Sequence, residues 1–168
     1  SLNRNYGDDS RSEVNIDNAG NIVLAACTQS SGFPTTPGAF MTTYGGGGQD
    51  AVVIKLNSTA QSVIWSTFLG GNEDDAAYVI LPDASGNLYV AGGTASPNFK
   101  GITTSGGVIA NTFQGGEADG FIAEMNSAGT AMIRGTYLGT PSVDQIYGIQ
   151  KDKNGVIYVM GTTQGAWP

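Results

Sequence analysis

Histidine is absent from the 168 residues, and cysteine occurs once, at Cys27. The lack of histidine excludes Ser-His-Asp and Cys-His catalysis, histidine-based zinc sites and the commonest general base at neutral pH. A single cysteine excludes an internal disulfide, and its place in the apolar run 23–27 predicts a buried, unreactive thiol. Paired carboxylates, as in glycoside hydrolysis, are the catalytic arrangement that the sequence leaves open.

Charged residues are also few, because they make up 12% of the chain, with 7 basic and 14 acidic side chains and a formal net charge of −7. Nucleic acids and anionic membrane surfaces both require basic patches, so neither is an expected partner. No apolar run approaches the ~20 residues of a membrane-spanning helix. The sequence thus predicts no nucleic-acid binding and no membrane insertion.

What the chain does contain is an internal repeat, whose complete central unit runs from Phe68 to Gly139. The segments 17–28, 83–94 and 152–163 align with one another, as do 50–60 with 119–129 and 62–71 with 131–140. The turn glycines Gly20, Gly86 and Gly155 are 66 and then 69 residues apart. A repeat of this length indicates tandem copies of one supersecondary unit.

Each unit is predicted to hold four short strands, since the apolar runs are short, rich in Val, Ile and aromatics, and bounded by Gly, Asn, Asp or Pro. Tight Asp-x-x-Gly turns join the first strand to the second at 17–20, 83–86 and 152–155. Helical periodicity is almost absent. The expected strands are 12–16, 22–27, 51–56, 63–69, 76–81, 87–92, 119–125, 131–138, 145–150 and 156–160.

A small sheet repeated in tandem buries its faces by radial stacking, which is the β-propeller solution. The motifs FPTTPGAF at 33–40 and DAVVIKLN at 50–57, with D-x-x-G-N-x-Y-V-x-G-x-T at 83–94, resemble the SBBP β-propeller repeat. The resemblance extends from about Tyr6 to Thr163, although 100–110 lacks the FPTTPGAF match and Glu124 replaces Lys55. It implies a large, modular bacterial protein that is secreted or attached to the cell surface, in many cases through type IX secretion.

The predicted fold is therefore all-β, a β-propeller fragment of four-stranded antiparallel blades of about 69 residues within one domain, 1–168. The blades are expected at 6–70 and 71–139, with the first two strands of a third at 140–168. Propellers need about four to eight blades. Other blades, from the same chain or a neighbouring one, are thus expected partners, and the isolated segment should aggregate or form a ring-completing oligomer.

Strand alternation places two kinds of connection on one face, and this loop face is the predicted binding surface. It gathers the long connections 28–49 and 94–118, the second of which is Gly/Thr-rich, and the acidic connections between units. Aromatic side chains in the long connections are candidates for stacking on a ligand such as a sugar, or for pinning the loops to the blades. They are Phe33, Phe40, Tyr44, Phe99 and Phe113.

The acidic connections are candidates for calcium, which binds carboxylate and carbonyl oxygens on flexible loops. The candidate ligands are Asp8, Asp9, Asp74 and Asp75, although no EF-hand pattern is present. No cofactor is expected to be required, and no catalytic residue is predicted, because acids that recur once per unit indicate a structural role.

Three functions remain open at this stage. The favoured one is a non-catalytic propeller module that binds a partner protein or a glycan as a scaffold or adhesion module of an extracellular or cell-surface protein. The second is a propeller enzyme acting on polysaccharide, which would need two convergent carboxylates in a cleft, one with a raised pKa. The third is a purely structural array stabilised by calcium at the blade junctions.

Overall fold

A computed structural model describes residues 12–167, and within that range the chain forms ten β-strands and no helix. It follows that no helix among these residues is long and apolar enough to span a membrane. The strands are β1 (Glu13–Ile16), β2 (Ile22–Thr28), β3 (Asp50–Leu56), β4 (Val63–Leu69), β5 (Asp75–Pro82), β6 (Leu88–Thr94), β7 (Asp119–Met125), β8 (Met132–Leu138), β9 (Asp144–Lys151) and β10 (Ile157–Thr163).

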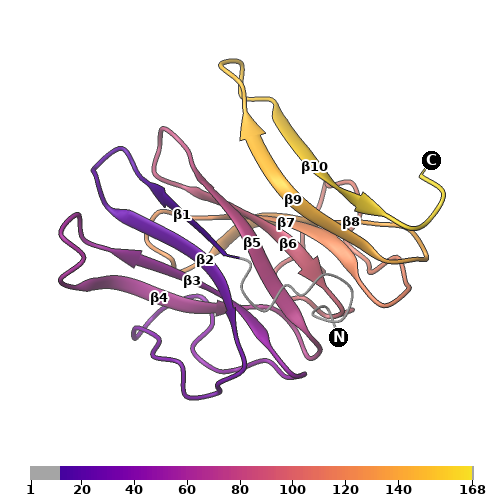
Figure 1. Cartoon of the computed structure of the whole chain (residues 1–168), viewed down its shortest axis with the longest axis horizontal. Helices are drawn as coiled ribbons and strands as arrows, with labels where there is room; N and C mark the ends of the chain where they lie inside the picture. Colours follow the sequence, from indigo (N-terminus) through magenta and orange to yellow (C-terminus); the bar gives the residue numbers. More distant parts are fainter. Residues whose placement is uncertain (1–11, 168) are drawn as a thin grey trace.

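The strands form three antiparallel sheets in chain order. β1 to β4 make the first sheet and β5 to β8 the second, each with neighbouring strands paired in sequence, while β9 pairs with β10. The sheets follow one another side by side across the molecule (Figure 1). All ten predicted strands are confirmed, and so is the all-β fold of a propeller fragment.

The turns form as their sequences predict. In the turn at 83–86, the Asp83 carboxylate accepts hydrogen bonds from the backbone N–H groups of Ser85 (2.8 Å) and Asn87 (2.9 Å). Gly86 then adopts a φ of +81°, which glycine reaches without steric strain because it has no Cβ atom. At the other type of turn, 57–60, Ala60 takes a φ of +56°, which is uncommon for a residue with a Cβ atom.

The first seam between sheets is formed by β5, which packs across β1, β2 and β3. Polar contacts pin this seam at its edge, because the Glu13 carboxylate accepts a hydrogen bond from Ile80 N at 2.6 Å and Asn15 Nδ2 donates to Ile80 O at 3.3 Å. The interior is one apolar cluster that draws on both sheets. Its largest fully buried members include Leu69, Ile80, Leu88, Phe99, Ile102, Phe121, Met125 and Tyr137.

The second seam joins the second sheet to β9, which packs against β5, β6 and β7. Ile146 and Ile149 of β9 are buried there with Tyr78, Tyr89 and neighbouring apolar residues of the second sheet. Cys27, predicted to be buried, is half-buried and packs against the edge of this cluster. The last strand, β10, pairs only with β9 among the described strands, and its side chains are mostly exposed.

One departure from the repeat motif is explained by a cross-strand pair. In the first sheet Lys55 lies opposite Trp65 and forms an ion pair with Asp17 at 2.8 Å. In the second sheet the equivalent pair is Glu124 opposite Arg134, and these two side chains bind each other at 2.9 Å. Both positions of the pair therefore differ between the sheets, and in the second sheet the charge of Glu124, at the position of Lys55, is neutralised by Arg134.

We predict that Gly129→Ala destabilises the protein by about 1–3 kcal/mol. Gly129 has a φ of +69°, and an added Cβ atom would lie 2.4 Å from the Trp65 ring, whose Nε1 donates to Ser127 O at 3.1 Å. Urea unfolding of both proteins measures the difference. Gly106→Ala is the control, because an added Cβ atom there meets no atom within 4 Å, and it should change stability by less than about 0.5 kcal/mol. Equal effects of the two changes would contradict the packing described here.

Candidate functional site

The long connections of both units run back along the outer strands of their sheets. In the first unit Thr36 N donates to Ser66 O at 3.1 Å, and Phe68 N donates to Met41 O at 3.0 Å. In the second unit Tyr137 N donates to Ala110 O at 2.9 Å, which is the equivalent contact. Since β4 and β8 are sheet edges, these loops cover backbone groups that would otherwise be open to another strand. Part of each loop thus serves edge protection and lies away from the predicted loop face.

Two of the five aromatic candidates occupy equivalent packing positions. The rings of Tyr44 and Phe68 make an edge contact at 5.8 Å, and those of Phe113 and Tyr137 do the same at 6.0 Å. Phe33 also packs edge-on against Phe68, at 5.5 Å. These contacts fasten the loops to the outer strands, in agreement with the pinning role that the sequence left open.

Phe99 and Phe40 differ sharply in exposure. Phe99 is fully buried, its ring lies 4.7 Å from that of Phe121, and its backbone N–H donates to the Tyr137 hydroxyl at 3.1 Å. Its side chain therefore belongs to the core and does not reach a ligand in solvent. Phe40 is half-buried, and Lys100 Nζ lies over its ring at 4.7 Å from the centroid. Of the five, Phe40 is the one that borders an open groove.

This groove, here called the inter-loop groove, has a volume of about 610 Å³. Phe40 comes to it from the first long connection; Lys100, Gly101 and 104–106 come from the second; and residues 130–134 form its other wall. The Ser105 hydroxyl fixes the wall, because it donates to Gly101 O at 2.8 Å and accepts from Gly135 N at 2.9 Å. The two units thus build one concave surface between them, and sequence reasoning identified only its aromatic member.

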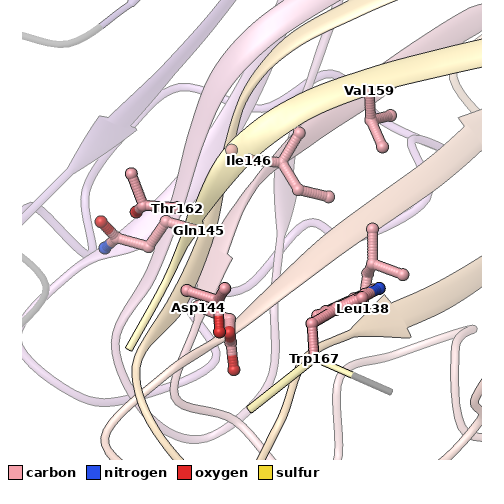
Figure 2. A pocket seen from close by; sticks show the side chains of 9 residues that line it. Leu138, Asp144, Gln145, Ile146, Val159, Thr162 and Trp167 are labelled. Atoms are coloured by element: carbon pink, nitrogen blue, oxygen red, sulfur yellow. The ribbon is translucent and has the colours of Figure 1, made fainter. Parts of the chain in front are cut away.

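A second cavity, of about 340 Å³, lies at the seam between the second and third sheets. Leu138, Ile146, Val159 and Trp167 line its apolar part, and Asp144 lies at one end (Figure 2). Leu69, Ala77 and Val90, which are equivalent to Leu138, Ile146 and Val159, are buried at the first seam in one cluster with Phe99 and Phe121. These two phenylalanines come from the long connection and the third strand of the second unit. This cavity is therefore a seam that a third strand of the next unit would fill.

Four aspartates, buried by 98% or more, begin strands at both seams. They are Asp50 and Asp119, which start the third strands of their sheets 69 residues apart, and Asp75 and Asp144, which start the first strands with the same spacing. Each receives a backbone N–H from a nearby connection, for example Gly71 N to Asp75 at 2.7 Å and Thr140 N to Asp144 at 2.6 Å. The equal spacing was visible in the sequence, but the burial was not.

Burial raises the pKa of three of these carboxyl groups. The pKa of Asp50 rises to about 6, and those of Asp75 and Asp119 rise to about 7, because desolvation disfavours the charged form. A neighbouring carboxylate adds to each shift: Asp74 acts on Asp50, Asp50 acts on Asp75, and Asp144 acts on Asp119. Among the described residues, one carboxylate oxygen each of Asp50, Asp119 and Asp144 is buried without a hydrogen-bond partner.

The candidate calcium ligands divide between described and undescribed parts of the chain. Asp8 and Asp9 lie outside residues 12–167. Asp74 accepts a hydrogen bond from Gly48 N at 2.6 Å, and Asp75 binds Gly71 N, the Ser96 hydroxyl at 2.9 Å and the Thr94 hydroxyl. Within the described range no three acidic, cysteine or histidine side chains gather closely enough to hold a metal ion. Calcium binding stays a prediction.

We predict that the protein loses stability as the pH rises from about 4 to about 7. An aspartate whose pKa is raised on folding binds its proton more tightly in the folded state. The free energy of unfolding therefore falls as rising pH removes that proton. Asp119→Asn removes one such group while keeping an acceptor for Gln114 N, which bonds Asp119 at 2.6 Å. Its free energy of unfolding should vary less with pH and should exceed that of the wild type at pH 8.

Denaturant melts between pH 4.5 and 8 test this prediction. The control is Glu117→Gln, since Glu117 is exposed and its replacement should leave the slope unchanged. Parallel curves for wild type and Asp119→Asn would show that Asp119 ionises normally. The pKa of Asp17, which Lys55 and Asn21 lower to about 2 against the effect of burial, lies below this pH window.

Comparison with known proteins bears on one part of the chain directly. A model of the SBBP β-propeller repeat family matches residues 133–166, which run from β8 through β9 and β10. A search of curated proteins finds no match. The matched segment joins the second sheet to the third, so it covers the seam rather than a single sheet. The resemblance predicted from the motifs is confirmed for this segment: residues 133–166 are similar to the β-propeller repeat of the SBBP family.

Proposed function

We propose that this propeller-type repeat module is a non-catalytic binding scaffold of an exported or cell-surface bacterial protein. The observation that carries the proposal is the inter-loop groove, which is open to solvent and formed jointly by the two long connections. Rigid strands position both loops, which is the usual arrangement for binding surfaces on repeat scaffolds. The bacterial surface context is supported by the resemblance to SBBP repeats.

The burial of the titrating carboxyl groups supports a non-catalytic role. A polysaccharide-cleaving enzyme needs two carboxyl groups at a cleft, one of them with a raised pKa. Here Asp50, Asp75 and Asp119, the described acids with raised pKa, are fully buried at the seams, where a sugar chain does not reach them. Their hydrogen bonds hold loops and strand ends in place, so their chemistry is structural.

A second function, assembly with further blades, is favoured by the third sheet. On β10, Tyr158 is 58% exposed and Met160 68%, although the equivalent residues of β6, Tyr89 and Ala91, are buried. The outer edge of β6 pairs with β7, while the same edge of β10 has no partner strand within the described residues. Blades of this or a neighbouring chain are the partners that such an edge accepts.

Binding at the groove is tested by screening the immobilised module against an array of polysaccharides and candidate surface proteins. Thr104→Trp should abolish binding, because Thr104 is exposed and lines the groove, which a bulky ring would fill. Ala84→Trp is the control, since Ala84 is exposed on the 83–86 turn, outside the groove. Binding that survives Thr104→Trp, or no binding at all, would contradict the proposal.

Assembly is tested by sedimentation of the 168-residue chain at micromolar concentration. We expect oligomers, because the open edge and exposed apolar side chains of β10 favour strand pairing. Val159→Lys should shift the protein towards monomer, since Val159 is 38% exposed and lines the seam cavity. The control is Thr59→Lys, at an exposed turn of the first sheet. A wild-type monomer would count against this function.

A further inference from the structure

The distribution of positive charge singles out the inter-loop groove. Five of the seven basic residues lie in the described range, and two of them, Lys100 and Arg134, line this groove. Lys55 and Lys151 are paired elsewhere, with Asp17 at 2.8 Å and Asp83 at 3.5 Å, and Arg134 is itself paired with Glu124 at 2.9 Å. The described lining of the groove contains no acidic side chain. Lys100, which forms no ion pair with the described acids, therefore gives the groove a net positive charge in a chain of net charge −7.

The two cations are held in place but retain donors. Lys100 is exposed and donates one hydrogen bond, to Phe40 O at 2.7 Å, so its ammonium group has two further N–H bonds. The Arg134 side chain is 65% exposed, and its Nε binds Glu124 at 2.9 Å. Lysine acts on an anion as a point charge, whereas the planar guanidinium of arginine can bind a carboxylate through two donors.

Neutral polar groups surround these cations. Thr104, Thr130, Gly101 and Gly106 line the same groove, and Phe40 adds an aromatic side chain to its lining. A solvent-open groove with a few placed polar groups and an aromatic ring suits a polar chain such as a polysaccharide. The positive charges add the requirement that this chain carry anionic groups.

From this arrangement we propose that the groove binds an acidic polysaccharide, with sugar carboxylates placed against Lys100 and Arg134. The inference rests on the proposed scaffold function and specifies its ligand. The net charge of the whole chain opposes a polyanion only at long range. At physiological salt the Debye length is about 8 Å, so distant acids are largely screened and the groove cations dominate at contact.

The test compares two probes with the same sugar backbone: polygalacturonate and its fully methyl-esterified form, which lacks the charges. Isothermal titration should show polygalacturonate binding at least about tenfold more tightly than the ester, since charge-assisted hydrogen bonds contribute most of the difference. Affinity should fall as salt rises from about 0.05 to about 0.5 M. Equal binding of the two probes would overturn the inference.

Variants locate the effect. Lys100→Gln should weaken polygalacturonate binding about fivefold to tenfold, while Lys100→Arg should retain it. Lys153→Gln, at an exposed position of the 152–155 turn, removes the same charge away from the groove and should change little. A loss in Lys153→Gln as large as that in Lys100→Gln would mean that only total charge matters, which contradicts the proposed site. Thermal melts confirm that each variant is folded.

The outcomes separate the two proposals. If the methyl ester binds as well as polygalacturonate and Thr104→Trp abolishes both, the groove is a binding site for neutral glycan, so the inference fails and the scaffold function stands. If neither probe binds, the inference fails by itself, and the scaffold function is then decided by the wider array. If polygalacturonate binds equally to Thr104→Trp, the site lies elsewhere and both proposals fail for this ligand.

Discussion

The structure depends on burying both faces of small sheets at the seams between units. A four-stranded sheet that packs one face on a neighbouring sheet still has its other face exposed, and the next unit covers that face. The buried aspartates at the strand entries fix how neighbouring units meet. Asp75 N donates to Gln49 O at 2.9 Å and Asp144 N to Ala118 O at 2.8 Å, so the start of each new sheet is tied to the residue just before the third strand of the previous sheet.

The need to join neighbouring sheets explains why polar side chains of the repeat are used to hold the fold together. A buried carboxylate is costly unless backbone and hydroxyl donors surround it. Those donors come from the connections, as where Gly45 N bonds Asp50 at 2.5 Å and Gln114 N bonds Asp119 at 2.6 Å. The loops are thereby held from inside at their ends and from outside along β4 and β8. Long connections without secondary structure become ordered parts of the fold.

The sequence was sufficient for what is local and periodic. Strand positions and the Asp-x-x-Gly turns follow from alternation and turn chemistry, and the repeat then implies stacked sheets. Features that depend on packing between units were not accessible. The sequence places Phe99 among the aromatics of the long connections, but its ring is in the core because its loop folds back to meet Phe121 and Tyr137. Nothing in the local sequence distinguishes it from Phe40, whose groove exists only once both loops are in place.

The two units share their packing residues but differ at positions that line the inter-loop groove. Tyr44 with Phe68 and Phe113 with Tyr137 make the same contact in both units. By contrast, Arg134 stands where the first unit has Trp65, and Lys100 stands where it has Pro34. Ile109, which is 75% exposed, replaces Phe40 in the second unit. Because the inter-loop groove takes side chains from two neighbouring units, substitutions at its lining positions can change its chemistry while the fold stays constant.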